Sequence, residues 1–215
     1  MKKFFKSIGK GIGIIIKTII GFLLTVFCIL LYIPFKIIFP IKIVGKKNLK
    51  NCPDGKLISC NHYSNFDVWI LNIFFFKATW RRKYLAKKEL GENIFTRTLV
   101  GGLGAIFINR NALDMKAMKQ TLKELKKGKN VIIFPEGTRN KTESENLQNL
   151  KSGIIFFAEK SNSYIVPMLI KHRIRPFRKN KIIISEPYKI TFTGKEGQAK
   201  ELEKLNCIYA DLKNQ

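Results

Sequence analysis

A histidine and an aspartate five positions apart have the clearest capacity for chemistry in this chain, His62 and Asp67 in the segment NHYSNFD at residues 61–67. An apolar run precedes the histidine and a helical pattern follows it. A carboxylate one helical turn further on can accept the proton on one imidazole nitrogen and fix the tautomer. The other nitrogen is then free to take a proton from a substrate hydroxyl. On the pair alone, which is a weak motif, a surface histidine near a helix-capping aspartate is the better explanation.

A second polar segment, FPEGTR at residues 134–139, follows another apolar run. Its proline and glycine predict a sharp turn that gathers backbone amides and two charged side chains. The planar guanidinium of Arg139 suits a phosphate, and we expect Glu136 to orient hydroxyls or that arginine. The alternative is an ordinary strand-to-loop turn with a solvated ion pair.

Arg110 ends a third apolar run, at residues 104–109. Together with Arg139 it predicts a phosphate site beside the base. Lys87 and Lys151 would add positive charge. Because the chain has 40 lysines and arginines, a solvated surface position is the default for each lysine.

These segments belong to a pattern of alternating strands and helices that begins near residue 41. The expected strands are 56–60, 83–86, 104–109, 130–134, 164–170 and 181–185, and the expected helices are 66–77, 114–127, 150–160 and 199–212. This alternation predicts an α/β fold, a mostly parallel mixed sheet covered by helices on both faces. Catalytic loops should then lie at the carboxyl ends of the strands.

The N-terminal region differs from this pattern. Residues 18–35 carry no charge, and lysines flank the stretch densely on both sides. No small-residue cleavage site follows, which excludes a secretory signal peptide. Lysines on both flanks favour the cytoplasmic face for both ends, so an interfacial or re-entrant hairpin is preferred to a single membrane span. We therefore expect a membrane-anchoring helical segment at residues 1–40 and one α/β domain at 41–215.

The net charge of +25 requires an anionic partner, either nucleic acid or an anionic lipid surface. The apolar stretch and the absence of a nucleic-acid-reading motif favour lipid. The four cysteines show no CxxC spacing and only two histidines are present, so no metal site is expected. Cys60 as a nucleophile is supported by nothing beyond its place next to His62.

Taken together, the segments resemble the glycerolipid acyltransferase family, especially bacterial 1-acylglycerol-3-phosphate O-acyltransferases. Four blocks occur in the family's order: NHxxxxD at residues 61–67, a GxxFIxR-like block at 104–110, FPEGTR at 134–139 and Val-Pro at 166–167. The segments at 86–90 and 151–153 are also similar to family positions. The resemblance implies acyl transfer from acyl carrier protein (acyl-ACP) or acyl-CoA to a lysophospholipid, forming phosphatidic acid at the cytoplasmic face of the cell membrane. It implies no metal, no cofactor and no nucleic acid.

The resemblance also implies roles for individual residues. His62 would be the general base and Asp67 its partner. The acceptor phosphate would be bound by Arg110 and Arg139, with support from Glu136, Gly137 and Thr138 and a weaker contribution from Lys87. The family's second block often has an acidic residue where this chain has Asn109, which leaves the acceptor's finer identity open. Another lysolipid or glycerol 3-phosphate as acceptor, a thioesterase, and a non-catalytic membrane protein with this fold are the alternatives.

Overall fold

The computed structural model describes residues 15–215 apart from residues 17, 25, 28, 76–81, 111 and 141–149. Its centre is a seven-stranded sheet in the order β1-β7-β6-β2-β5-β3-β4. The strands are β1 Ile41–Val44, β2 Leu57–Cys60, β3 Arg82–Lys87, β4 Ala105–Ile108, β5 Asn130–Ile133, β6 Ile165–Ile170 and β7 Asn180–Ile184. The strands from β6 to β4 are parallel, whereas β7 runs antiparallel to β6 and carries β1 parallel to itself. The predicted mostly parallel mixed sheet is confirmed.

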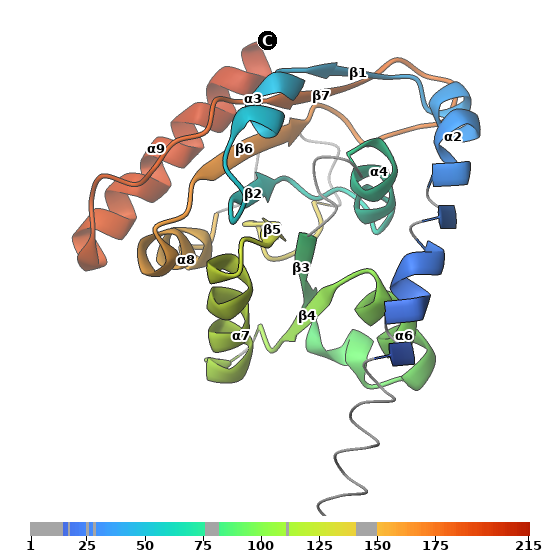
Figure 1. Ribbon diagram of the computed structural model, residues 1–215. Coiled ribbons are helices and arrows are strands. Elements are labelled where there is room, and N and C mark those ends of the chain that lie inside the picture. Colours follow the sequence, from blue (N-terminus) through green and yellow to red (C-terminus); the bar gives the residue numbers. More distant parts are fainter. Residues whose placement is uncertain are drawn as a thin grey trace, which may run out of the picture.

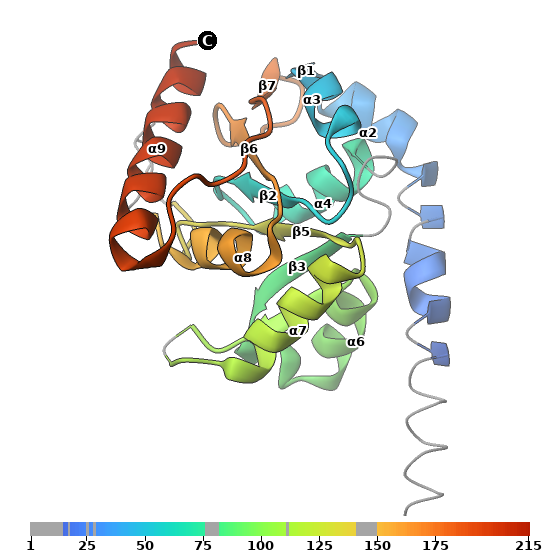
Figure 2. The same cartoon turned by 60° about the vertical axis from the view of Figure 1, so that its left-hand side comes forward.

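Helices cover both faces of this sheet (Figures 1 and 2). The helices are α2 Tyr32–Ile38, α3 Lys46–Asn51, α4 Phe66–Phe74, α6 Ile94–Gly102, α7 Met115–Lys126, α8 Gly153–Ser161 and α9 Gly194–Asn214, with a 3-10 turn η1 at Lys88–Gly91. Helices α7, α8 and α9 pack on one side, and α4 with α2 on the other. Two separate apolar clusters, one for each face, fill the space between sheet and helices.

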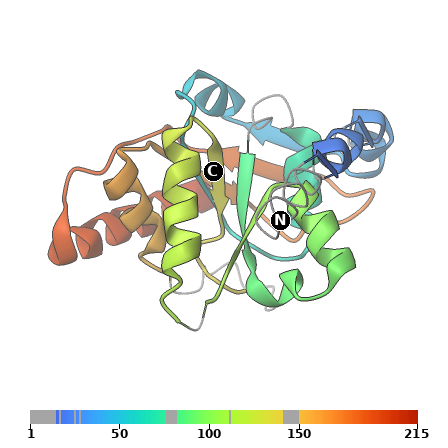
Figure 3. The ribbon, with the colours of Figure 1, turned by 60° about the horizontal axis from the view of Figure 1, so that its bottom comes forward.

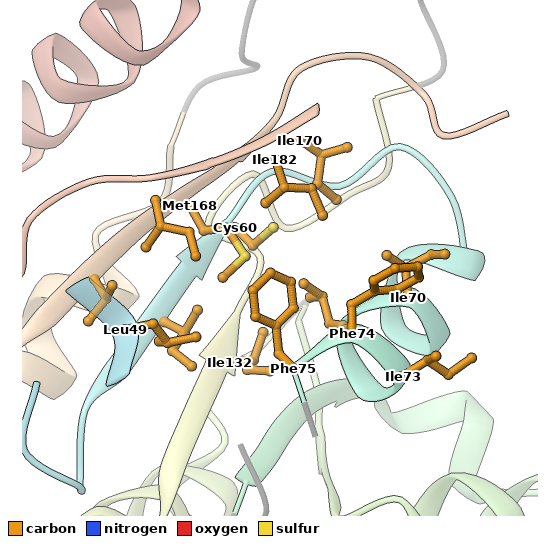
Figure 4. Packing of buried hydrophobic residues seen from close by; sticks show 14 of the residues in the cluster. Leu49, Cys60, Ile70, Ile73, Phe74, Phe75, Ile132, Met168, Ile170 and Ile182 are labelled. Carbon is orange, nitrogen blue, oxygen red and sulfur yellow. The ribbon is translucent and has the colours of Figure 1, made fainter. Parts of the chain in front are cut away.

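The three central strands β2, β5 and β6 are buried at every position. Their near-continuous apolar runs are typical of parallel strands covered on both faces. On one face, Ile70 and Phe74 of α4 belong to the same buried cluster as Cys60 and Met168 (Figure 4). This packing fixes α4 against the end of β2, and so fixes the turn that joins them.

The predicted elements are recovered within a few residues, and four short elements were not predicted. The helix expected at 66–77 ends at Phe74, the one expected at 150–160 begins at Gly153, and the C-terminal helix is longer at both ends. The elements β1, α3, η1 and α6 were missed. Three of these have four to six residues, too few to show a periodicity.

The N-terminal region is helical in the described residues between 15 and 38 and runs along one side of the domain (Figure 1). It touches α6 where two glycines meet, because a Cβ on Gly21 would lie 3.1 Å from the carbonyl oxygen of Gly102. Among the described residues, no helix is long and apolar enough to cross a membrane. Residues 25 and 28 of the predicted apolar stretch lie outside the described residues.

Candidate active site

The five parallel strands end at one edge of the sheet, which we call the catalytic edge. His62 follows β2 there, Arg110 follows β4, Glu136 follows β5, and Lys87 closes β3. These ends lie side by side because β2 pairs in parallel with β5 and β6, β5 with β3, and β3 with β4. The prediction that the polar segments gather at the carboxyl ends of the strands is confirmed.

The histidine and aspartate form a buried pair. Nδ1 of His62 lies 2.9 Å from Oδ2 of Asp67, and the two side chains are 11% and 1% exposed. The same oxygen accepts the backbone amides of Tyr63, at 2.7 Å, and Ser64, at 2.8 Å. Because Oδ2 already accepts two backbone amides, we expect it to accept from the imidazole as well, which places the ring proton on Nδ1. Nε2 is then the basic nitrogen.

The backbone of His62 is held from both sides by the loop after β5. Its amide donates to Oε1 of Glu136 at 2.9 Å, and its carbonyl accepts the amide of Asn140 at 2.8 Å. The imidazole also stacks on Phe134, with 4.1 Å between ring centroids and 22° between planes. The two most conspicuous sequence motifs, NHxxxxD and FPEGTR, therefore build one structure.

The side chain of the buried Glu136 thus holds the backbone of His62, and its expected support of a bound phosphate stays a prediction. The bond joins residues 74 positions apart. In the sequence, the only indication of this contact is that both motifs are present.

Asn61 continues the sheet beyond the last residue of β2. Its side-chain amide donates to the carbonyl of Ile170 at 2.9 Å and its side-chain oxygen accepts the amide of Ile170 at 2.7 Å. A side chain here makes both hydrogen bonds that a backbone would make in a ladder. The backbone at residues 61 and 62 is therefore free to turn toward Glu136 and α4.

Arg110 lies at the mouth of a pocket of about 240 Å³ on the catalytic edge. Its Nη1 donates to the carbonyl of Gly137. Gly137 has φ of +71°, and a Cβ there would lie 2.8 Å from Cε of Lys151. Partial burial lowers the pKa of Arg110, and the charge of Glu89 partly offsets this. Arg110, Gly137 and Lys151 therefore form one polar group above an apolar floor that includes Ile133, Ile154 and Phe157.

The remaining predicted phosphate ligands lie further out. Thr138 and Arg139 are exposed on the turn after β5. Lys87 points to Glu89, with 3.1 Å between Nζ and Oε1, and both side chains are about half exposed. Lys151, for which a solvated surface position was the default, joins the pocket.

Cys60 does not have the environment of a nucleophile. It is fully buried between sheet and α4, and burial raises the pKa of its thiol well above the ordinary value, with Asp67 adding to the effect. A thiolate is disfavoured there.

Comparison with known proteins agrees with this geometry. A family model described as acyltransferase matches residues 40–171. The chain is 30% identical to the 1-acyl-sn-glycerol-3-phosphate acyltransferase of Bacillus subtilis over 81% of this chain and 88% of that one. It is also 30% identical to the lyso-ornithine lipid O-acyltransferase of Pseudomonas aeruginosa, over 53% of this chain and 42% of that one. The solved 1-acyl-sn-glycerophosphate (LPA) acyltransferase of Thermotoga maritima matches in fold, with a TM-score of 0.61, 23% identity, and coverage of 81% of this chain and 73% of that one.

Proposed function

The chain belongs to the acyltransferase family, and from this premise we propose that it moves a fatty acyl group from a thioester to the free hydroxyl of 1-acylglycerol 3-phosphate. The product is phosphatidic acid. The observation that carries the proposal is the buried His62–Asp67 pair, in which Oδ2 of Asp67 lies 2.9 Å from Nδ1 of His62 and also accepts two backbone amides.

In the proposed reaction, Nε2 of His62 removes the proton from the acceptor hydroxyl as its oxygen attacks the thioester carbon. The new carbon–oxygen bond forms, the carbon–sulfur bond breaks, and the imidazolium returns the proton to the departing thiolate. Asp67 stabilises the imidazolium between these steps without taking its proton. No residue is acylated, which agrees with the burial of Cys60.

The acceptor phosphate docks on the cations of the edge. Arg110 and Lys151 lie at one pocket with the carbonyl side of the Gly137 turn between them, and Arg139 projects from the same turn. The apolar floor of the pocket suits a hydrocarbon chain, because apolar walls with a few polar groups at the mouth are typical of lipid-sized ligands. Acyl-CoA and acyl-ACP both supply the thioester that this chemistry needs.

The reaction takes place at a membrane in this proposal, with residues 1–40 as anchor and 41–215 as the acyltransferase domain at the cytoplasmic face. Support comes from the large apolar side chains that the N-terminal region exposes to solvent: Ile15, Ile16, Ile19, Phe22, Leu23, Val26, Phe27, Ile29, Leu30, Ile33 and Ile37. Contiguous exposed apolar surface of this kind marks an interaction site.

The test is acyl transfer from labelled acyl-CoA and acyl-ACP to lysophosphatidate in detergent, for wild type and His62→Ala. We expect phosphatidate from the wild type and a loss of about 10²-fold to 10⁴-fold in the variant, the range that a positioned general base contributes. Cys60→Ala is the neighbouring control and should keep its turnover. Equal rates for wild type and folded His62→Ala would refute the mechanism, and product only from another lysolipid in an acceptor panel would change the acceptor.

A further inference from the structure

The loop between β6 and β7, residues 171–179, is strongly basic. It reads KHRIRPFRK, with five lysines and arginines and no acidic residue, and we call it the cationic loop. It is tied to the end of the N-terminal helical region, since the amide of Phe177 donates to the carbonyl of Ile38 at 2.6 Å. Figures 1 and 3 show the loop beside α2.

The ends of the cationic loop, the first residues of β1 and β7, and Lys36 of α2 line an open pocket of about 550 Å³, with five lysines and no carboxylate side chain in the lining. Its lining is Lys36, Pro40, Ile41, Lys42, Lys171, His172, Lys179, Asn180 and Lys181. Among the described residues, none of these lysines is paired with a carboxylate side chain, although Lys181 donates to the main-chain oxygen of Gln215, the last residue. A concave cluster of like charges of this kind concentrates anions.

Phe177 stands at the tip of the cationic loop with 77% of its surface exposed. Its φ of +55° is uncommon for a bulky residue and costs free energy. The exposed side chains of Ile33 and Ile37 belong to the adjoining α2 region, at 70% and 69%. Apolar side chains and cations thus stand next to each other on one surface, which is the composition of a membrane-surface contact.

This surface lies on the catalytic edge. The loop leaves β6 directly after Ile170, the residue that Asn61 holds next to His62. Because β7 is antiparallel to β6, Asn180 and Lys181 return to the same edge, and β1 begins there beside them.

We propose that the cationic loop is a second membrane-docking element, in which Phe177 enters the interfacial layer of the bilayer and the lysine pocket takes the phosphates of anionic phospholipids. An acidic carrier protein would satisfy the lysines but would leave the exposed Phe177, Ile33 and Ile37 without a role. The inference goes beyond the proposed reaction. Its test measures no turnover, so either can fail without the other.

The experiment places a tryptophan at the tip with Phe177→Trp in the full chain and measures quenching by vesicles whose acyl chains carry bromine. Vesicles of phosphatidylcholine alone are compared with vesicles that also contain phosphatidylglycerol. Phe192→Trp is the matched control, because Phe192 is also an exposed aromatic residue but lies two positions before α9, a helix on the other side of the domain from α2 (Figure 1). Wild type supplies the background of the native tryptophans.

We expect quenching of the tryptophan in Phe177→Trp, stronger with phosphatidylglycerol, and none above background in Phe192→Trp. Adding Lys171→Glu and Lys179→Glu should weaken vesicle binding through the loop by about tenfold or more, since each lysine near an anionic surface contributes roughly 1 kcal/mol. The equal charge change of Lys195→Glu with Lys200→Glu on α9 should leave the quenching in place.

Equal quenching in the two tryptophan variants would overturn the proposal, because the loop would then be no closer to the acyl chains than α9. Quenching that is unchanged by Lys171→Glu together with Lys179→Glu would overturn the role of the pocket. Absent quenching, combined with a loss of acyl-ACP binding in that charge-reversed variant, would assign the surface to the carrier protein instead.

Discussion

Asp67 combines orientation of the base with the geometry of the turn that carries it. Its Oδ2 lies within 2.9 Å of Nδ1 of His62 and of the backbone amides of Tyr63 and Ser64, from which it accepts hydrogen bonds. An amide in place of the carboxylate either turns its oxygen to these donors or offers them its NH₂ group. The second orientation puts the ring proton on Nε2 and removes the base.

Asp67→Asn should therefore lower kcat by about 10²-fold to 10⁴-fold, as expected when a base loses its tautomer. The Michaelis constant for lysophosphatidate should change little, because Asp67 is buried and its hydrogen bonds go to His62, Tyr63 and Ser64. Steady-state kinetics beside Asp211→Asn, an exposed aspartate on α9, provides the measurement and its control. A variant with unchanged kcat would show that the pair does not act as base and orienter.

Glu136 could support the backbone of His62 or a bound phosphate, and the sequence motif alone does not distinguish these two roles. Glu136→Gln keeps an oxygen for the amide of His62, whereas Glu136→Ala leaves that buried amide without this partner, at a cost of about 1–3 kcal/mol. We expect Glu136→Ala to lower both the melting temperature and kcat, and Glu136→Gln to stay much closer to wild type. A raised Michaelis constant for lysophosphatidate with unchanged kcat would instead return Glu136 to the phosphate site.

The limits of sequence reading are clearest among these residues. His62 and Asp67 were identified because both partners lie within seven residues of sequence. The functions of Asn61 and Glu136 depend on partners 109 and 74 positions away, so only the fold reveals them. Asn140, whose amide fixes the carbonyl of His62, has no chemical signature at all.

At the scale of elements, α7 supports the Arg110 turn through its N-cap. Asp114 accepts the amide of Ala117 in the first turn of α7 and the amide of Asn109 in the preceding loop, each at 3.0 Å. The hydrogen bond from Ala117, followed by that from Asn109, lowers the pKa of Asp114. The helix and the loop that carries Arg110 are thereby joined through one carboxylate.

Asp114→Asn should keep the bond to Ala117 but lose the one to Asn109, because an amide nitrogen cannot accept. Since the folded pKa is lowered, the stability from Asp114 is present above the ordinary aspartate value of about 3.9 and is lost as pH falls through the folded pKa. Thermal unfolding should therefore show wild type above Asp114→Asn at pH 7, with the gap closing below about pH 4. A gap independent of pH would exclude the carboxylate charge as its source.

The bounds of an element were predicted more accurately where its run of apolar residues is continuous. The strands β2, β5 and β6 were predicted to within a residue or so, because they are apolar at nearly every position. Helix α6 was missed because Gly101 and Gly102 make a poor helical pattern. Those glycines are explained only by what α6 touches.

At the scale of the whole molecule, Gly102 determines how closely the N-terminal region approaches the domain. A Cβ at Gly102 would lie 2.8 Å from Cγ2 of Ile20 and 3.3 Å from Cδ1 of Leu24, whereas one at Gly101 would meet nothing within 4 Å. Gly102→Leu should thus push the N-terminal region away while the domain stays folded. We expect phosphatidate formation on vesicles to fall several-fold relative to the rate in detergent, and Gly101→Leu to resemble wild type in both assays.

The two hydrogen bonds between Asn61 and Ile170 make the base and the cationic loop parts of one rigid frame. If the loop rests on the bilayer, this connection fixes the distance of His62 from the lipid headgroups. A lysolipid whose hydroxyl lies at that distance from the headgroups reaches the base without leaving its leaflet. In a lysolipid with a longer polar spacer between acyl chain and hydroxyl, the hydroxyl would lie beyond the base. Discrimination among acceptors would then depend partly on how far the hydroxyl lies from the membrane surface, in addition to the contacts made by Arg110 and Arg139.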